Sequence, residues 1–172
     1  MFDPTAFENM KVVLEGALYD LDITGDIIIT DRNDWINTAK LSRKFDIYFQ
    51  LPENPVTAKL ELDSSLENLA AELLPGYASD ILSGCYINLE FSFSHQQRIV
   101  DYKKVEKVLL DIWGENRKVI QSVTFYPLQK EKIMTSVASV KFDRIIYEDQ
   151  MNDLVDMIDV MITTLEQLSS FL

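Results

Sequence analysis

The single histidine, His95, and the single cysteine, Cys85, are the side chains best suited to nucleophilic or acid–base chemistry. They lie ten residues apart in the stretch CYINLEFSFSH, where apolar and polar residues alternate as in a β-strand. Ten residues of strand span roughly 33 Å, so Cys85 and His95 share a face but cannot form a catalytic pair. We expect a core cysteine and a histidine at the core boundary.

The opposite face of the same stretch carries polar side chains, including Glu90. This face is either exposed to solvent or one wall of a pocket. Carboxylates and imidazoles serve as general acids and bases, so Glu90 and His95 are the residues that a pocket or a carboxylate-dependent enzyme would use.

A second candidate site is DLDITGDIIITD, residues 20–31, where oxygen-bearing side chains follow the spacing of a calcium-binding loop. The ligand positions of such a loop are occupied by Asp20, Asp22, Thr24 and Asp31. Gly25 stands where the loop must turn sharply, but Asp31 replaces the usual bidentate Glu and Ile28 fills a polar position. The competing interpretation is a hairpin with Thr24 and Gly25 as its turn. We expect the hairpin, with a divalent-cation site as the alternative.

Other chemical signatures are missing from the sequence. It contains no GxxxxGK[ST], GxGxxG, GxSxG, HExxH or CxxC motif. We therefore expect no cofactor and no catalytic site of a familiar kind.

Composition limits the partners and the compartment. The 172 residues include 28 acidic and 16 basic side chains, a formal net charge of −12, which opposes binding to nucleic-acid phosphates. The chain has no long apolar run and no signal-peptide pattern at its start, so we expect no membrane association. A lone cysteine suits a reducing compartment, and we expect a cytoplasmic protein of one domain.

The elements that must position these residues follow from periodicity. Apolar residues at helical spacing predict an opening helix that ends between Gly16 and Tyr19. Alternation predicts strands over residues 45–51, 57–62, 85–95, 119–126 and 133–146, and helices are predicted over residues 65–74 and 99–113. Together these elements predict an α+β fold: an antiparallel β-sheet of hairpins with helices packed on it and a long amphipathic C-terminal helix.

The closing helix, MNDLVDMIDVMITTLEQLSSFL, gives the strongest positive signal for function. Its apolar stripe follows steps of four and three residues through Leu154, Ile158, Met161, Leu165 and Leu168. Such a stripe either covers the protein's own sheet or also contacts a partner. These five residues are the candidate partner-binding residues.

Three classes of function remain. The first is a noncatalytic protein-interaction module, an adaptor or a chaperone-like protein that forms a homo-dimer. The second is a small-ligand or divalent-cation-binding protein, and the third is a carboxylate-dependent enzyme. The acidity, the apolar closing helix and the missing motifs favour the first class.

Overall fold

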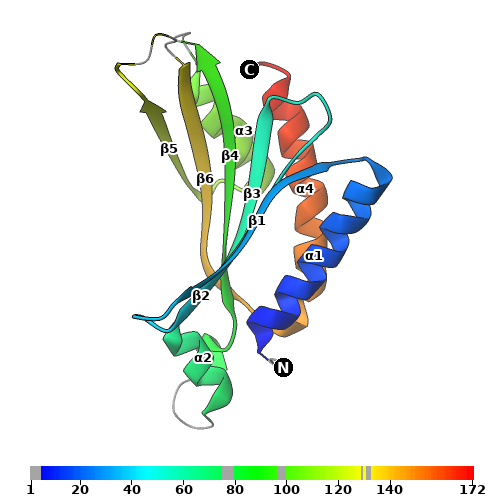
Figure 1. Ribbon diagram of the computed structural model, residues 1–172, viewed down its shortest axis with the longest axis vertical. Coiled ribbons are helices and arrows are strands. Elements are labelled where there is room, and N and C mark those ends of the chain that lie inside the picture. The colour runs from blue at the N-terminus through cyan, green and yellow to red at the C-terminus, as the bar shows by residue number, and fades with distance from the viewer. Residues whose placement is uncertain (1–4, 75–79, 97–99, 129, 131–132) are drawn as a thin grey trace.

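The computed structural model describes residues 5–74, 80–96, 100–128, 130 and 133–172 (Figure 1). The strands are β1 (Ile28–Asn37), β2 (Ser42–Gln50), β3 (Val56–Ser64), β4 (Cys85–Gln96), β5 (Lys118–Phe125) and β6 (Ile133–Ile146). The helices are α1 (Ala6–Thr24), α2 (Leu66–Leu73), α3 (Tyr102–Trp113) and α4 (Met151–Ser169). Two short 3₁₀ turns, η1 (Asp80–Leu82) and η2 (Glu148–Gln150), precede β4 and α4.

All six strands form one antiparallel sheet in the order β1-β2-β3-β4-β6-β5. This arrangement confirms the α+β prediction, and the predicted strands match β2 to β6 closely. After β4 the chain forms α3 and then β5, which does not pair with β4. A hairpin leads from β5 to β6, and β6 fills the position between β4 and β5. The later strand β6 therefore lies inside the sheet, and β5 forms its edge.

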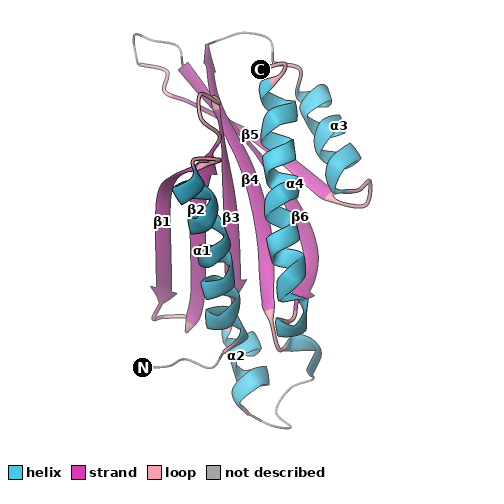
Figure 2. Cartoon of the chain, turned by 90° about the vertical axis from the view of Figure 1, so that its right-hand side faces the viewer, coloured by secondary structure: helices cyan, strands magenta, loops and turns pink. Residues whose placement is uncertain are grey.

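Helices α1, α3 and α4 cover one face of the sheet, while α2 lies beyond one end of it (Figure 2). Helix α4 contacts both α1 and α3, so the three helices form one layer. Many of the strand residues that face this layer are fully buried, including Phe45, Ile47, Phe49, Leu60, Leu62, Leu89 and Phe91. The hydrophobic core lies between this layer and the sheet.

The structure contradicts the predicted end of the opening helix. The helix runs through Gly16 to Thr24, because Leu14 and Leu18 continue its buried stripe and their burial outweighs the cost of one glycine. The predicted hairpin turn at Thr24 and Gly25 is therefore wrong. Gly25 instead ends the helix in the left-handed conformation, with φ +83°, and its N–H donates to the carbonyls of Asp22 and Leu21.

Candidate functional site

His95 lies near the end of β4 on the helix-covered face, and both of its ring nitrogens have hydrogen-bond partners. Nδ1 is 2.8 Å from the carbonyl oxygen of Gln96, and Nε2 is 2.9 Å from Oγ of Ser136. A carbonyl only accepts hydrogen bonds, so in the neutral ring Nδ1 carries the proton and Nε2 accepts from the Ser136 hydroxyl. The ring is therefore fixed between β4 and β6.

Ser136 and His95 share the hydrogen bond of a serine nucleophile and its base. The sequence reasoning missed this pair, because 41 residues separate the two and only the β4–β6 register brings them together. Ser136 is 3% exposed and stands opposite Phe93 of β4 and Val123 of β5. Because Ser136 pairs with a strand on each side and is buried, its hydroxyl cannot reach a substrate. The backbone N–H groups around it are used by the sheet and cannot stabilise an oxyanion. The geometry makes the pair a structural link.

A cavity of about 380 Å³ opens beside His95, between the end of β4, the start of α3 and the end of α4. Its charged lining residues already have partners. The Asp101 carboxylate caps α3 by accepting the Lys104 backbone N–H at 3.1 Å, and the Lys104 ammonium lies 4.1 Å from the centre of the Phe171 ring. The cavity therefore presents few uncommitted polar groups to a ligand.

Glu90 lies on the opposite, open face of the sheet, so the structure does not bring Glu90 and His95 into one pocket. On the open face Glu90 accepts from Lys59 at 3.2 Å, and Ser139 Oγ lies 3.4 Å from it. Lys59 is also 2.7 Å from Glu61, which in turn lies 3.2 Å from Lys44. These side chains form a network of ion pairs across β2, β3 and β4.

The network shifts the pKa values of its members. Burial alone would raise the pKa of Glu61, but the hydrogen bond and charge of Lys59, with the charge of Lys44, lower it below its usual value. Burial would likewise lower the pKa of Lys59, and the carboxylates of Glu61 and Glu90 raise it instead. The charged side chains of this network, at the centre of the open face, are therefore paired with one another.

Cys85 begins β4 at the end remote from His95, as the strand spacing predicts. Its thiol is buried, and burial raises the pKa of that thiol to about 12. A thiol with this pKa is protonated at neutral pH and is not a nucleophile.

The four candidate calcium ligands lie on two different elements. Asp20, Asp22 and Thr24 belong to the end of α1, while Asp31 belongs to β1. Asp22 accepts the backbone N–H of Ile29 at 3.0 Å, and Asp31 accepts the backbone N–H of Arg32 at 2.9 Å. Among the described residues, no group of three or more His, Cys, Asp or Glu side chains could hold a metal ion. The twelve residues do not form a loop around a common centre, because the first five are helical.

The five candidate partner-binding residues of α4 all face the core. Leu154, Ile158, Met161, Leu165 and Leu168 are each 0–1% exposed. They contact this chain's own sheet and helices, so a partner of α4 would meet its outer face. The sequence could not distinguish these two arrangements, because the same stripe serves both.

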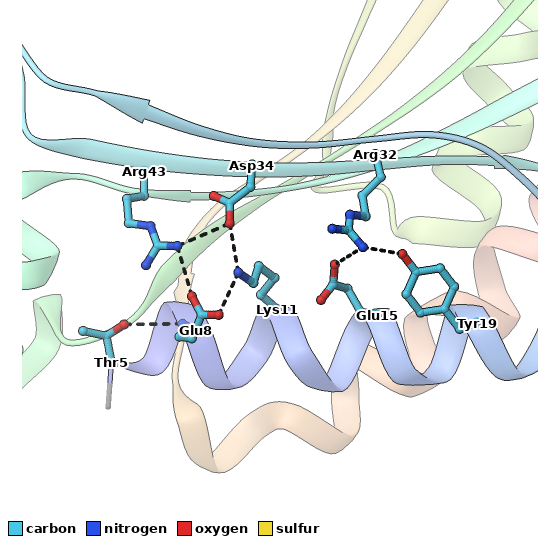
Figure 3. Close-up of polar contacts among 8 residues, drawn as sticks. All are labelled: Thr5, Glu8, Lys11, Glu15, Tyr19, Arg32, Asp34 and Arg43. Carbon is cyan, nitrogen blue, oxygen red and sulfur yellow. Dashed lines mark hydrogen bonds and ion pairs between the residues drawn. The ribbon is translucent and has the colours of Figure 1, made fainter. Parts of the chain in front are cut away.

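Ion pairs fasten α1 to strands β1 and β2 (Figure 3). Lys11 of α1 lies 2.7 Å from Glu8 and 2.9 Å from Asp34, and Arg43 of β2 lies 3.0 Å from Glu8. Further along the helix, Arg32 of β1 pairs with Glu15 at 3.2 Å. The charged side chains Arg32 and Asp34 of β1 are therefore engaged in ion pairs with α1.

The two edge strands of the sheet differ in character. The β1 edge carries charged residues and has a register irregularity between Ile29 and Asp31, both of which discourage pairing with another strand. The β5 edge is regular, and residues 119–129 contain no charged side chain. In the described part of the chain, no strand pairs with its outer side.

Exposed apolar side chains gather on β5, on the residues that follow it and at the start of β6. They are Ile120, Val123, Phe125, Tyr126, Leu128 and Ile133, with exposed fractions from 41% for Ile133 to 97% for Leu128. An edge strand with a single charged side chain, Lys118, and this much apolar surface is a template for an incoming strand. We regard the β5 edge, defined by residues 118–126, as the candidate functional site.

Searches against family models, curated proteins and solved structures return no match to this chain. Within the described ranges, no helix is both long and apolar enough to cross a bilayer.

Proposed function

We propose that this protein is a noncatalytic, cytoplasmic protein-interaction module that binds an extended segment of another protein by strand addition at the β5 edge. The contrast between the two edges of the sheet carries this proposal. Both edges carry exposed apolar side chains, but β1 holds several charged residues, is irregular and is held to α1 by ion pairs, whereas β5 is regular and has one charged side chain, Lys118. Natural sheets protect the edges that they do not use.

The state of the polar groups supports a noncatalytic role. His95 is fixed between Gln96 and Ser136, and Glu90 is fixed by Lys59. Catalytic acids and bases must reach a substrate with at least one proton-transfer position open. The buried, unpaired Cys85 is in keeping with a reducing compartment such as the cytoplasm.

Strand addition explains why affinity would come from the backbone of β5. Every second residue of an edge strand directs its N–H and C=O away from the sheet, and an added strand satisfies these groups. The exposed side chains Val123 and Phe125 then pack beside alternate residues of the added strand.

Two proline substitutions test the proposal. Successive backbone amides of a strand point in opposite directions, so of Ser122→Pro and Val123→Pro only one removes a hydrogen bond to β6. The variant that keeps the wild-type melting temperature is the one whose amide faces outward. Peptides that bind the wild-type protein are first selected from a phage library of random extended sequences. We expect the outward-facing proline variant not to bind these peptides. Peptides that bind both proteins equally would refute strand addition at β5.

The sequence also predicts self-association, and the same edge offers a site for a second copy. Native mass spectrometry of the wild-type protein and of the outward-facing proline variant reports this directly. A dimer that the proline abolishes would assign the edge to a second copy of this chain.

A further inference from the structure

The strand register places two lysines directly opposite each other at the β5 edge. Lys118 of β5 is the cross-strand partner of Lys141 of β6, and both lie on the open face because their neighbours Val119 and Val140 face the core. Like charges in such a pair destabilise a sheet. Among the described residues, no carboxylate lies within ion-pair distance of either lysine.

The open face has a second like-charge pair, Asp46 opposite Glu61, but there both carboxylates are compensated: Asp46 accepts hydrogen bonds from Asn33 and Trp35, and Glu61 pairs with Lys44 and Lys59. Lys59 is held by Glu61 and Glu90, and Lys44 is held by Glu61 and Asp63. Glu90 lies on β4, the strand next to β6, but its carboxylate is engaged by Lys59 and Ser139. On the open face, as far as the structure describes it, the lysines without an ion pair therefore stand where the sheet ends, at the outer strand β5 and its neighbour β6 (Figure 1).

The charge distribution along the chain reinforces this local observation. Residues 98–144, which include α3, β5 and most of β6, hold ten of the 16 basic residues and only six of the 28 acidic ones. This segment carries a net positive charge in a protein whose net charge is −12. The described residues of this segment alone hold eight basic and five acidic side chains, so an acidic partner is attracted to the part of the molecule formed by α3, β5 and β6.

A second copy of this chain does not resolve the conflict. Residues 117–130 contain no Asp or Glu, so β5 of another copy brings no carboxylate to the lysines. An antiparallel pairing centred on Ser122, for example, sets Lys118 beside the second copy's Tyr126 and doubles the number of uncompensated cations at the interface.

We propose that the segment added at the β5 edge is acidic, with a carboxylate on the open face that Lys118 and Lys141 bind together. Its alternate, core-side residues are apolar, because they lie beside Val123 and Phe125. This inference rests on the proposed strand addition and specifies its partner as an extended acidic segment of another protein.

A charge reversal at Lys118 separates binding from stability. In the free protein, Lys118→Glu replaces a repulsive pair with an ion pair to Lys141, so we expect the melting temperature to rise by about 1–4 °C. The same variant should bind the peptides selected by the wild-type protein at least about tenfold more weakly. Lys40→Glu, at the turn beside the opposite edge, makes the same change in net charge and should leave both quantities unchanged.

The experiment uses the full chain and the random peptide library described above, read by sequencing and by fluorescence anisotropy. Selected peptides with Asp or Glu at alternating positions, bound weakly by Lys118→Glu and normally by Lys40→Glu, support the inference. Neutral or basic peptides that bind at the β5 edge, or acidic peptides that bind Lys118→Glu as well as the wild type, would overturn it while leaving strand addition intact. Peptides insensitive to the outward-facing proline, or no selected peptide at all, would overturn strand addition itself.

Discussion

A single glycine decides how α1 passes into β1. Gly25 has φ +83°, a conformation that side chains with a Cβ atom disfavour, and its N–H closes the last turn of the helix. Asp22 then receives the N–H of Ile29 and holds the first residues of β1 against the helix end. The acidic spacing that resembled a cation site therefore belongs to a helix end and the turn after it.

Two glycine substitutions in α1 should act in opposite directions. Gly25→Ala should lower the free energy of unfolding by about 1–2 kcal/mol, because alanine is strained at this φ. Gly16 is an exposed residue in the helix interior with nothing within 4 Å of an added Cβ, so Gly16→Ala should raise it by about 0.5–1 kcal/mol. Urea unfolding of both variants measures these changes. Two changes of the same sign would contradict the placement of Gly16 inside the helix and Gly25 at its end.

Helix α4 is an element of the core. Its apolar stripe closes the layer between α1 and α3, while acidic residues such as Asp153, Asp156 and Asp159 cover its exposed side. The hydrogen bond from Trp113 Nε1 to Thr164 Oγ1, at 3.2 Å, adds a polar link to α3. The helix therefore holds the layer together.

Two alanine substitutions in α4 measure how much its buried stripe contributes to the free energy of unfolding. Leu165→Ala removes a fully buried side chain, and we expect it to lower the free energy of unfolding by about 2–5 kcal/mol. Val155→Ala, on the exposed side of the same helix, should change it by less than about 0.5 kcal/mol. If the two variants had equal stability in urea, the core placement of the stripe would be wrong.

Local pattern sufficed to predict most elements, because alternation in β2, β3 and β4 reports directly which face of each strand is buried. It failed at the end of α1, where Gly16 suggested a stop and tertiary packing of Leu14 and Leu18 extended the helix. It also could not find the β5 edge or the Lys118–Lys141 pair. Those depend on strand order and register, which join residues far apart in the chain.

The molecule as a whole separates its charges. Carboxylates and lysines neutralise one another at the centre of the open face, where Glu61 is only 7% exposed. Among the described residues, Lys118 and Lys141 form no ion pair, and the excess of acid lies outside residues 98–144. If the β5 edge binds the proposed acidic segment, stability and recognition use different groups on the same sheet.

The central network should make stability depend on pH. Because the pKa of Glu61 in the folded protein is below its ordinary value of 4.5, its ion pairs stabilise the fold above that pH. This contribution is lost as the pH falls through the lower pKa of the folded state. Glu61→Gln should therefore lower the free energy of unfolding by about 1–3 kcal/mol at neutral pH and by less in acid.

Urea unfolding at pH 7 and at about pH 3.5 checks this expectation. Glu115→Gln, at an exposed position without an ion pair among the described residues, is the matched control and should follow the wild type at both values. An equal loss of stability for Glu61→Gln at the two pH values would show that its charge contributes nothing.

The buried thiol of Cys85 makes the protein its own reporter of opening. It is the only cysteine in the sequence and stands opposite Ile146 in the β4–β6 ladder. Its side chain lies in the core, so a water-soluble thiol reagent can modify it only when a local opening exposes it. The labelling rate in native buffer therefore measures how often the structure opens around this end of the β4–β6 ladder, without any introduced probe.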